Sequence, residues 1–190
     1  MENEIIINTR GALEQQLMFA IDTAYAEIVT KKDAEHQYVT YHEFQAICHM
    51  VKNFFVSRVG DNVKEIDSAC ELALAVLAPD AATRLKHVKM AYSMLSGLAG
   101  VTAIITGIGM ALGWGTGVIQ AVVVFFTGTS TTGPVGFAVA GLALVGIAAY
   151  FVFSNEDEIS LSNKAMKALK DGVKAALPEV WKSYGNRFSN

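Results

Sequence analysis

Histidine is the residue type in this chain whose spacing most directly suggests chemistry. The four histidines are His36, His42, His49 and His87. His42 and His49 are seven residues apart, so a helix would place both on one face, where two imidazoles could begin a metal site. No third ligand accompanies them, and the chain has no His-Glu-x-x-His motif. We therefore expect no metal ion and no cofactor.

The segment KKDAEHQYVTYHEF resembles the end of an EF-hand calcium loop, with Glu43 at the position of the bidentate ligand. In that register Lys32 and Ala34 fall where calcium needs oxygen ligands. Thr40 and Glu43 also form a Thr-x-x-Glu capping box, which accounts for Glu43 as part of a helix start. We expect a helix N-terminus here rather than a calcium site.

Other catalytic signatures are missing from the sequence. Cys48 and Cys70 form no Cys-x-x-Cys pair and fit apolar helical patterns, so we expect both to be buried core residues. There is no Walker A lysine, and the net charge of −3 does not indicate a nucleic-acid partner. The sequence therefore predicts that the protein is not an enzyme and binds no nucleic acid.

Amphipathic helices must position these residues, and the hydrophobic spacing predicts an all-α helical bundle. Gly60 and Pro79 are stop signals, and Asp80 is a cap for the next helix. Residues 1–92 form an amphipathic N-terminal region in this scheme. Its expected helices span approximately residues 10–30, 40–60 and 61–78, and a fourth, over residues 81–95, runs on into the apolar middle.

The middle of the chain gives the strongest signal. Hydrophobic residues are 52% of the chain, and residues 90–155 contain no Asp, Glu, Lys, Arg or His. A straight helix over residues 95–128 would be roughly 50 Å long, against about 30 Å for a hydrocarbon core, so we expect it to bend. Residues 135–153 match the roughly 20 residues that one span needs. Residues 93–154 are therefore predicted to be a membrane-inserting hydrophobic hairpin, and the alternative is a buried hairpin in a soluble bundle.

Small and polar residues in the hairpin suggest particular roles, since glycine lets helix backbones approach closely in lipid. The predicted packing glycines are Gly100, Gly107, Gly136, Gly141 and Gly146. The predicted hinge is Gly113, Trp114, Gly115 and Gly117. Thr102, Thr106 and Gln120 could line a pore in an oligomer, or could equally bond to helix carbonyls.

Basic residues flank the hairpin on both sides, and its connecting turn TGTSTTGP has none. The positive-inside rule then keeps both termini cytosolic, unless a soluble form inserts later. Residues 155–190 are predicted to form a basic amphipathic helix that suits an anionic membrane surface or, alternatively, the outside of a bundle. Its candidate membrane-surface residues are Lys164, Lys167, Lys170, Lys174 and Trp181.

An apolar hairpin among amphipathic helices resembles, in layout, the helical pore-forming domains of colicins and, more distantly, the Bcl-2 fold. The resemblance implies a bundle that hides a hairpin, then inserts it and permeabilises a membrane. It rests on no sequence motif and transfers no functional residue.

The leading prediction is a membrane-inserting pore- or channel-forming protein of the toxin, defence or virulence effector type. Its expected partners are the lipid bilayer and further copies of the chain. One alternative is a membrane-anchored adaptor that binds a protein partner through residues 10–90. The other is a soluble helical binding protein with an unusually apolar interior.

Overall fold

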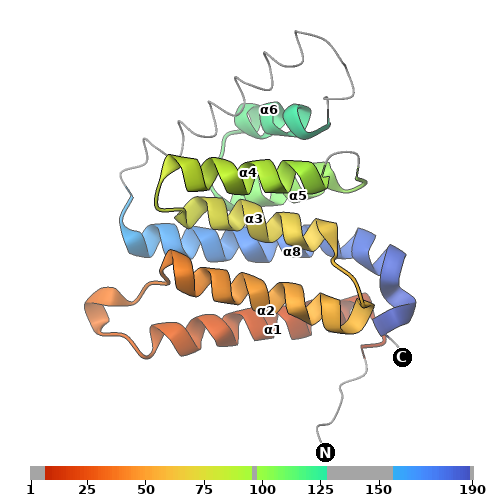
Figure 1. The fold of residues 1–190 in the computed structure, drawn as a ribbon, viewed down its shortest axis with the longest axis horizontal. Helices are drawn as coiled ribbons and strands as arrows, with labels where there is room; N and C mark the ends of the chain where they lie inside the picture. The colour runs from red at the N-terminus through yellow and green to blue at the C-terminus, as the bar shows by residue number, and fades with distance from the viewer. Residues whose placement is uncertain (1–6, 96–97, 128–155, 189–190) are drawn as a thin grey trace, which may run out of the picture.

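The computed structural model describes residues 7–95, 98–127 and 156–188 of the 190-residue chain. Over these residues the secondary structure is helical throughout, with no β-strand, which confirms the predicted all-α class (Figure 1). The elements are α1 (Arg10–Val29), η1 (Ala34–His36), α2 (Tyr41–Val59), α3 (Lys64–Leu77), α4 (Ala81–Leu95), α5 (Val101–Ala111), α6 (Thr116–Thr127) and α8 (Glu158–Phe188).

The helix ends follow the capping signals in the sequence. The backbone amide of Thr40 donates to Glu43 Oε2 at 2.8 Å, and the amide of Glu43 donates to Thr40 Oγ1 at 3.4 Å, which completes the capping box of α2. Gly60 ends α2 with a φ of 78°, a left-handed conformation that glycine adopts without steric cost. Asp80 accepts from the amide of Thr83 at 2.8 Å and so begins α4.

Replacing Thr40 with alanine should lower the free energy of unfolding by about 1 kcal/mol, because α2 loses its N-cap oxygen. Urea unfolding followed by circular dichroism measures this loss. Thr23→Ala is the matched control, since Thr23 is an exposed residue inside α1, and it should change stability by less than about 0.5 kcal/mol. Equal losses in the two variants would contradict the capping role.

The C-terminal helix α8 lies inside the bundle. It packs against α1, α2, α3 and α5, and Figure 1 shows it between the α3 layer and the α1–α2 layer. Small side chains on its inner face allow this close packing. The buried residues of α8 include Ala165, Ala168, Leu169, Gly172, Val173, Ala176 and Leu177.

Most of the lysines predicted to face a membrane surface make ion pairs within the chain. Lys167 is exposed, and the half-buried Trp181 stacks on Phe188 with a centroid distance of 5.9 Å. This is the arrangement of the outer face of a bundle helix, with α8 held to α1 by two of the pairs. The pairs are Lys164–Glu156, Lys170–Asp22 at 2.8 Å and Lys174–Glu14 at 3.9 Å.

The first half of the predicted hairpin forms two short helices, α5 and α6. An 11-residue helix such as α5 is about 16 Å long, roughly half of a hydrocarbon core. Its apolar face, including Val101, Ile104, Ile105 and Ile108, is buried within the bundle. Within residues 7–95, 98–127 and 156–188, no helix is both long and apolar enough to cross a bilayer.

The predictions of a transmembrane helix and of a pore-forming protein are therefore wrong. The expected topology with both termini cytosolic loses its support, and so does the pore-lining role of three residues. Thr102 and Gln120 are exposed, and Thr106 is half-buried. The other predicted span, residues 135–153, and the glycines Gly136, Gly141 and Gly146 lie outside the described residues.

The chain turns between α5 and α6 at the predicted hinge. Gly113 has a φ of 73°, and the amide of Trp114 donates to the carbonyl of Gly109 at 2.8 Å. The half-buried Trp114 ring packs against the core, whereas Gly115 and Gly117 face open space. The turn therefore folds α6 back so that Val122 and Phe126 join the same core.

Two of the predicted packing glycines lie near α8. A Cβ atom on Gly107 would be 3.1 Å from the carbonyl oxygen of Asp171, so its absence lets the α5 and α8 backbones approach. Gly172 on α8 permits the same close approach from the other helix, since a Cβ atom there would be 2.9 Å from the Ile108 side chain. Gly100 begins α5 beside Glu179. Gly107 and Gly172 thus pack helices inside the protein itself.

Candidate functional site

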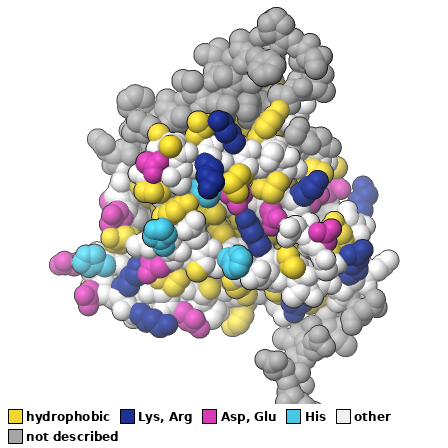
Figure 2. Space-filling view, in the orientation of Figure 1, with side chains coloured by type: hydrophobic (Ala, Val, Ile, Leu, Met, Phe, Trp, Pro, Cys, Tyr) yellow, Lys and Arg dark blue, Asp and Glu magenta, His cyan; other side chains and the backbone are white. Residues whose placement is uncertain are grey.

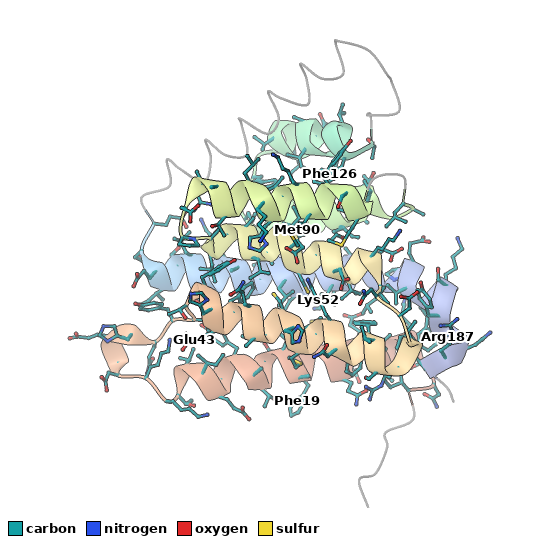
Figure 3. All side chains as sticks on the ribbon, viewed as in Figure 1. Phe19, Glu43, Lys52, Met90, Phe126 and Arg187 are labelled. Carbon is teal, nitrogen blue, oxygen red and sulfur yellow. The ribbon has the colours of Figure 1, made fainter. Side chains whose placement is uncertain are left out.

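A groove of about 560 Å³ opens between α2, α3 and α4. Its volume lies in the range of small-molecule sites, about 300–1,000 Å³. Figure 3 labels Lys52 of α2 and Met90 of α4, which belong to its two walls. The principal lining residues are Tyr41, Gln45, His49, Lys52, Glu71, Leu74, Lys86, His87 and Met90.

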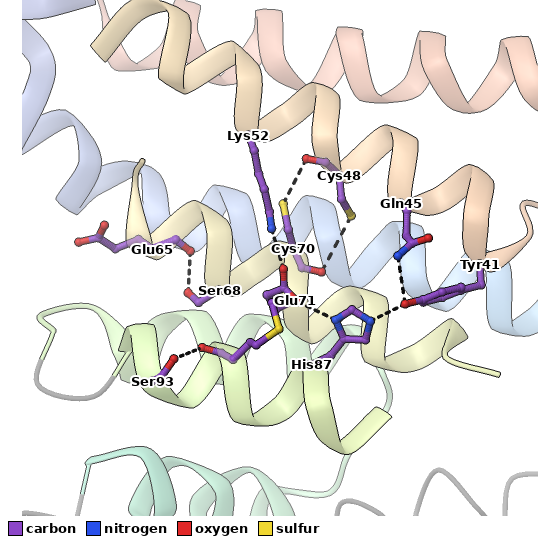
Figure 4. Close-up of polar contacts among 11 residues, drawn as sticks. Tyr41, Gln45, Cys48, Lys52, Glu65, Ser68, Cys70, Glu71, His87 and Ser93 are labelled. Carbon is purple, nitrogen blue, oxygen red and sulfur yellow. Dashed lines mark hydrogen bonds and ion pairs between the residues drawn. The ribbon is translucent and has the colours of Figure 1, made fainter. Parts of the chain in front are cut away.

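A chain of hydrogen bonds forms the floor of the groove (Figure 4). Glu71 is 3% exposed, and its Oε1 accepts from Lys52 Nζ at 2.6 Å while its Oε2 lies 2.6 Å from His87 Nδ1. His87 Nε2 lies 2.7 Å from the Tyr41 hydroxyl. Because a carboxylate accepts, His87 donates through Nδ1, and its Nε2 is paired with the Tyr41 hydroxyl. Gln45 Nε2 donates to the Tyr41 oxygen at 3.1 Å.

Helical spacing brings the α2 members of this network to one face. Tyr41, Gln45, Cys48 and Lys52 follow one another at intervals of three or four residues, so they line the same side of the helix. Sequence reasoning missed Glu71. The signal was a glutamate inside the apolar run CELALAVLA, on the face that the helical pattern turns inward.

Glu71 and Lys52 each stabilise the charged form of the other, as the directions of their pKa shifts indicate. Burial alone would raise the pKa of Glu71, but the hydrogen bonds from His87 and Lys52 outweigh it and hold the pKa below its usual value. For Lys52 burial acts to lower the pKa, and the bond to Glu71 overcomes it and raises the pKa. Burial and the charge of Glu71 raise the pKa of Tyr41, so this hydroxyl is neutral at pH 7.

Acid should therefore remove stability through Glu71. Its folded-state pKa lies below the ordinary value of 4.5, so its contribution is present above pH 4.5 and is lost as the pH falls through the folded pKa. Urea unfolding between about pH 3 and 6 measures this slope. Glu71→Gln should flatten it, whereas Glu65→Gln, on the same helix and without an ion pair among the described residues, should keep it. Identical slopes in the two variants would contradict this assignment.

The two cysteines lie between α2 and α3 beneath the network. Both are free and buried, as the sequence predicts. Cys48 Sγ lies 3.9 Å from the Cys70 carbonyl, and Cys70 Sγ lies 3.8 Å from the Cys48 carbonyl. Burial raises the pKa of Cys48 well above its usual value, so the group stays a thiol. The pair therefore acts as apolar packing under the groove.

The residues considered as calcium or metal ligands, Glu43, His42 and His49, do not form a metal site among the described residues. Glu43 Oε2 accepts from Lys32 Nζ at 2.6 Å as well as from the Thr40 amide. His42 Nδ1 lies 3.1 Å from Gln45 Oε1, and His49 is exposed farther along α2. In the described part of the chain, no three His, Cys, Asp or Glu side chains cluster in a way that could hold a metal ion.

None of the residues assigned from the sequence to glycine packing, the hinge, the pore or the membrane surface lines this groove. Comparison of the chain with protein-family models, curated proteins and solved structures gave no match. The layout resemblance to colicin domains therefore has no support from a relative. We therefore infer the function from the geometry of the groove.

Proposed function

We propose that this protein is a helical binding protein that holds a small molecule in the α2–α3–α4 groove. The observation that carries the proposal is the buried Lys52–Glu71–His87–Tyr41 network at the floor of the groove. A buried ion pair is often no more stabilising than apolar residues of the same volume, so it contributes little that packing could not. In a concave site, by contrast, such a network holds the lining side chains in fixed positions, and fixed polar groups orient a ligand.

Binding is favoured over catalysis because the acidic and imidazole groups of the network already have partners. Both carboxylate oxygens of Glu71 and both ring nitrogens of His87 already have partners, and Tyr41 is a neutral hydroxyl. A catalytic base or nucleophile needs an atom that can reach the substrate. The arrangement instead fixes the side chains that line the groove. Of the alternatives drawn from the sequence, this function corresponds to the helical binding protein. The residues that line the groove lie between Tyr41 and Met90.

Saturation-transfer NMR with a library of small-molecule fragments tests the proposal. Ala46 is exposed and lines the groove, so Ala46→Trp should fill it without disturbing the core. Fragments that bind the wild-type protein should lose their signal with Ala46→Trp. They should keep it with Ala26→Trp, the same substitution at an exposed position of α1 outside the groove. Binding that persists in both variants would reject the groove as the site.

A further inference from the structure

The two helices that form the outer walls of the groove, α2 and α4, carry more basic than acidic residues, although the whole chain has a net charge of −3. Glu43 is the one acidic residue in α2 and α4. Figure 2 shows Lys, Arg and His side chains over this face of the molecule, with Asp and Glu side chains among them. Basic walls around a concave site raise the local concentration of anions. Of the basic residues of the two helices, Lys52 and Lys86 line the groove, whereas Arg58, Arg84 and Lys89 do not.

Two polar side chains on opposite walls of the groove have no hydrogen-bond partner among the described residues. Lys86 of α4 and His49 of α2 both line the groove. Neither side chain makes a hydrogen bond or an ion pair to any residue that the structure describes. Lys52, in contrast, is paired with Glu71 and balances its charge, and His87 is hydrogen-bonded to the same carboxylate. The groove therefore presents uncompensated positive charge at Lys86.

Apolar surface lies beside these donors. Met90 is 37% exposed on α4, and Leu74 of α3 lies at the floor. The Met side chain is flexible and polarisable, so it adapts to apolar groups of different shapes. A ligand with one anionic end and one short apolar part would match both kinds of lining.

We infer that the groove binds a small organic anion, a carboxylate or phosphate on a short apolar group, between Lys86 and His49. This inference rests on the proposed function and names its ligand class. The anionic oxygens would accept charge-assisted hydrogen bonds from Lys86, and the apolar part would cover Met90 and Leu74.

Titration with four probes that share one hydrocarbon chain tests the inference. Hexanoate and hexyl phosphate carry the two candidate anions, hexanamide is the neutral control, and hexylammonium is the cationic control. Amide shifts of the groove residues in two-dimensional NMR report binding. We expect either anion, or both, to bind about tenfold more tightly than hexanamide, which corresponds to one charge-assisted hydrogen bond. The stronger of the two anions identifies the headgroup.

Charge variants assign the effect to individual side chains. Lys86→Gln should weaken binding of the anions about tenfold and leave hexanamide unchanged. Lys89→Gln removes the same charge from α4 outside the groove lining and should leave binding of the anions unchanged. His49→Ala should also weaken anion binding, whereas His36→Ala, in η1, should not.

The outcomes separate this inference from the proposed function. Equal binding of hexanamide and the anions, or equal effects of Lys86→Gln and Lys89→Gln, would overturn the anion class. The groove would still be the binding site if Ala46→Trp removed hexanamide binding. If none of the four probes shifts the groove amides, the inference fails, and the proposed function fails only if the fragment library also finds no groove binder.

Discussion

Gly107→Leu should lower the free energy of unfolding by about 3 kcal/mol, because the new side chain has no room between α5 and α8. Its Cβ atom would be 3.1 Å from the Asp171 carbonyl oxygen and 3.5 Å from Ala175 Cβ. The first of these neighbours is backbone, which cannot rotate away, so the helices must separate. Urea unfolding followed by far-ultraviolet circular dichroism measures the loss.

Gly117→Leu is the matched control for this prediction. Gly117 lies in the first turn of α6, and a Cβ atom there meets nothing within 4 Å. Leucine also has a better helix propensity than glycine, so this variant should be unchanged or slightly more stable, by less than about 1 kcal/mol. A Gly107→Leu protein as stable as Gly117→Leu would show that α5 does not pack on α8 as described.

Glu71→Ala should cost about 3 kcal/mol of unfolding free energy, because it leaves two buried polar partners without their acceptor. Lys52 and His87 both bind the Glu71 carboxylate at 2.6 Å. The Lys52 side chain is 24% exposed, so it can partly rehydrate, which places the expected loss at the lower end of the range for broken buried pairs. Urea unfolding at pH 7 measures the change.

Glu65→Ala provides the comparison on the same helix. Glu65 is half-buried near the start of α3, and its carboxylate forms no ion pair with a described residue. The loss should stay within about 0.5 kcal/mol. A double-mutant cycle between Glu71→Ala and Lys52→Ala should then give a coupling energy of at least about 1 kcal/mol. Strict additivity would mean that the ion pair does not stabilise the fold.

Local features of the fold could be predicted from the sequence. The Thr40–Glu43 capping box, the Gly60 stop and the break at Gly113 depend on a few neighbouring residues, so their spacing suffices. The groove could not be found in this way. Glu71 and His87 are 16 residues apart, and Tyr41 and His87 are 46 apart, so only the packing of three helices joins them.

The prediction of a transmembrane helix is wrong over the described residues because an uncharged apolar run satisfies a protein core as well as a bilayer. The apolar run around α5 does not indicate that α5 packs against α8. The small inner residues of α8 can be recognised as its packing surface only in the folded structure. The ion pairs of the α8 lysines could not be predicted from the sequence for the same reason. Lys170 pairs with Asp22, 148 residues away, and such a partner leaves no local trace in the sequence.

Backbone amide shift mapping of the wild-type protein with its tightest-binding fragment tests the central claim most directly. The account predicts that the largest shift changes cluster on the groove-lining positions of α2, α3 and α4, which include His49, Leu74 and Lys86. Ala46→Trp should abolish these changes. Shift changes centred on α1 or α6, unaffected by Ala46→Trp, would contradict the assignment of the groove as the binding site.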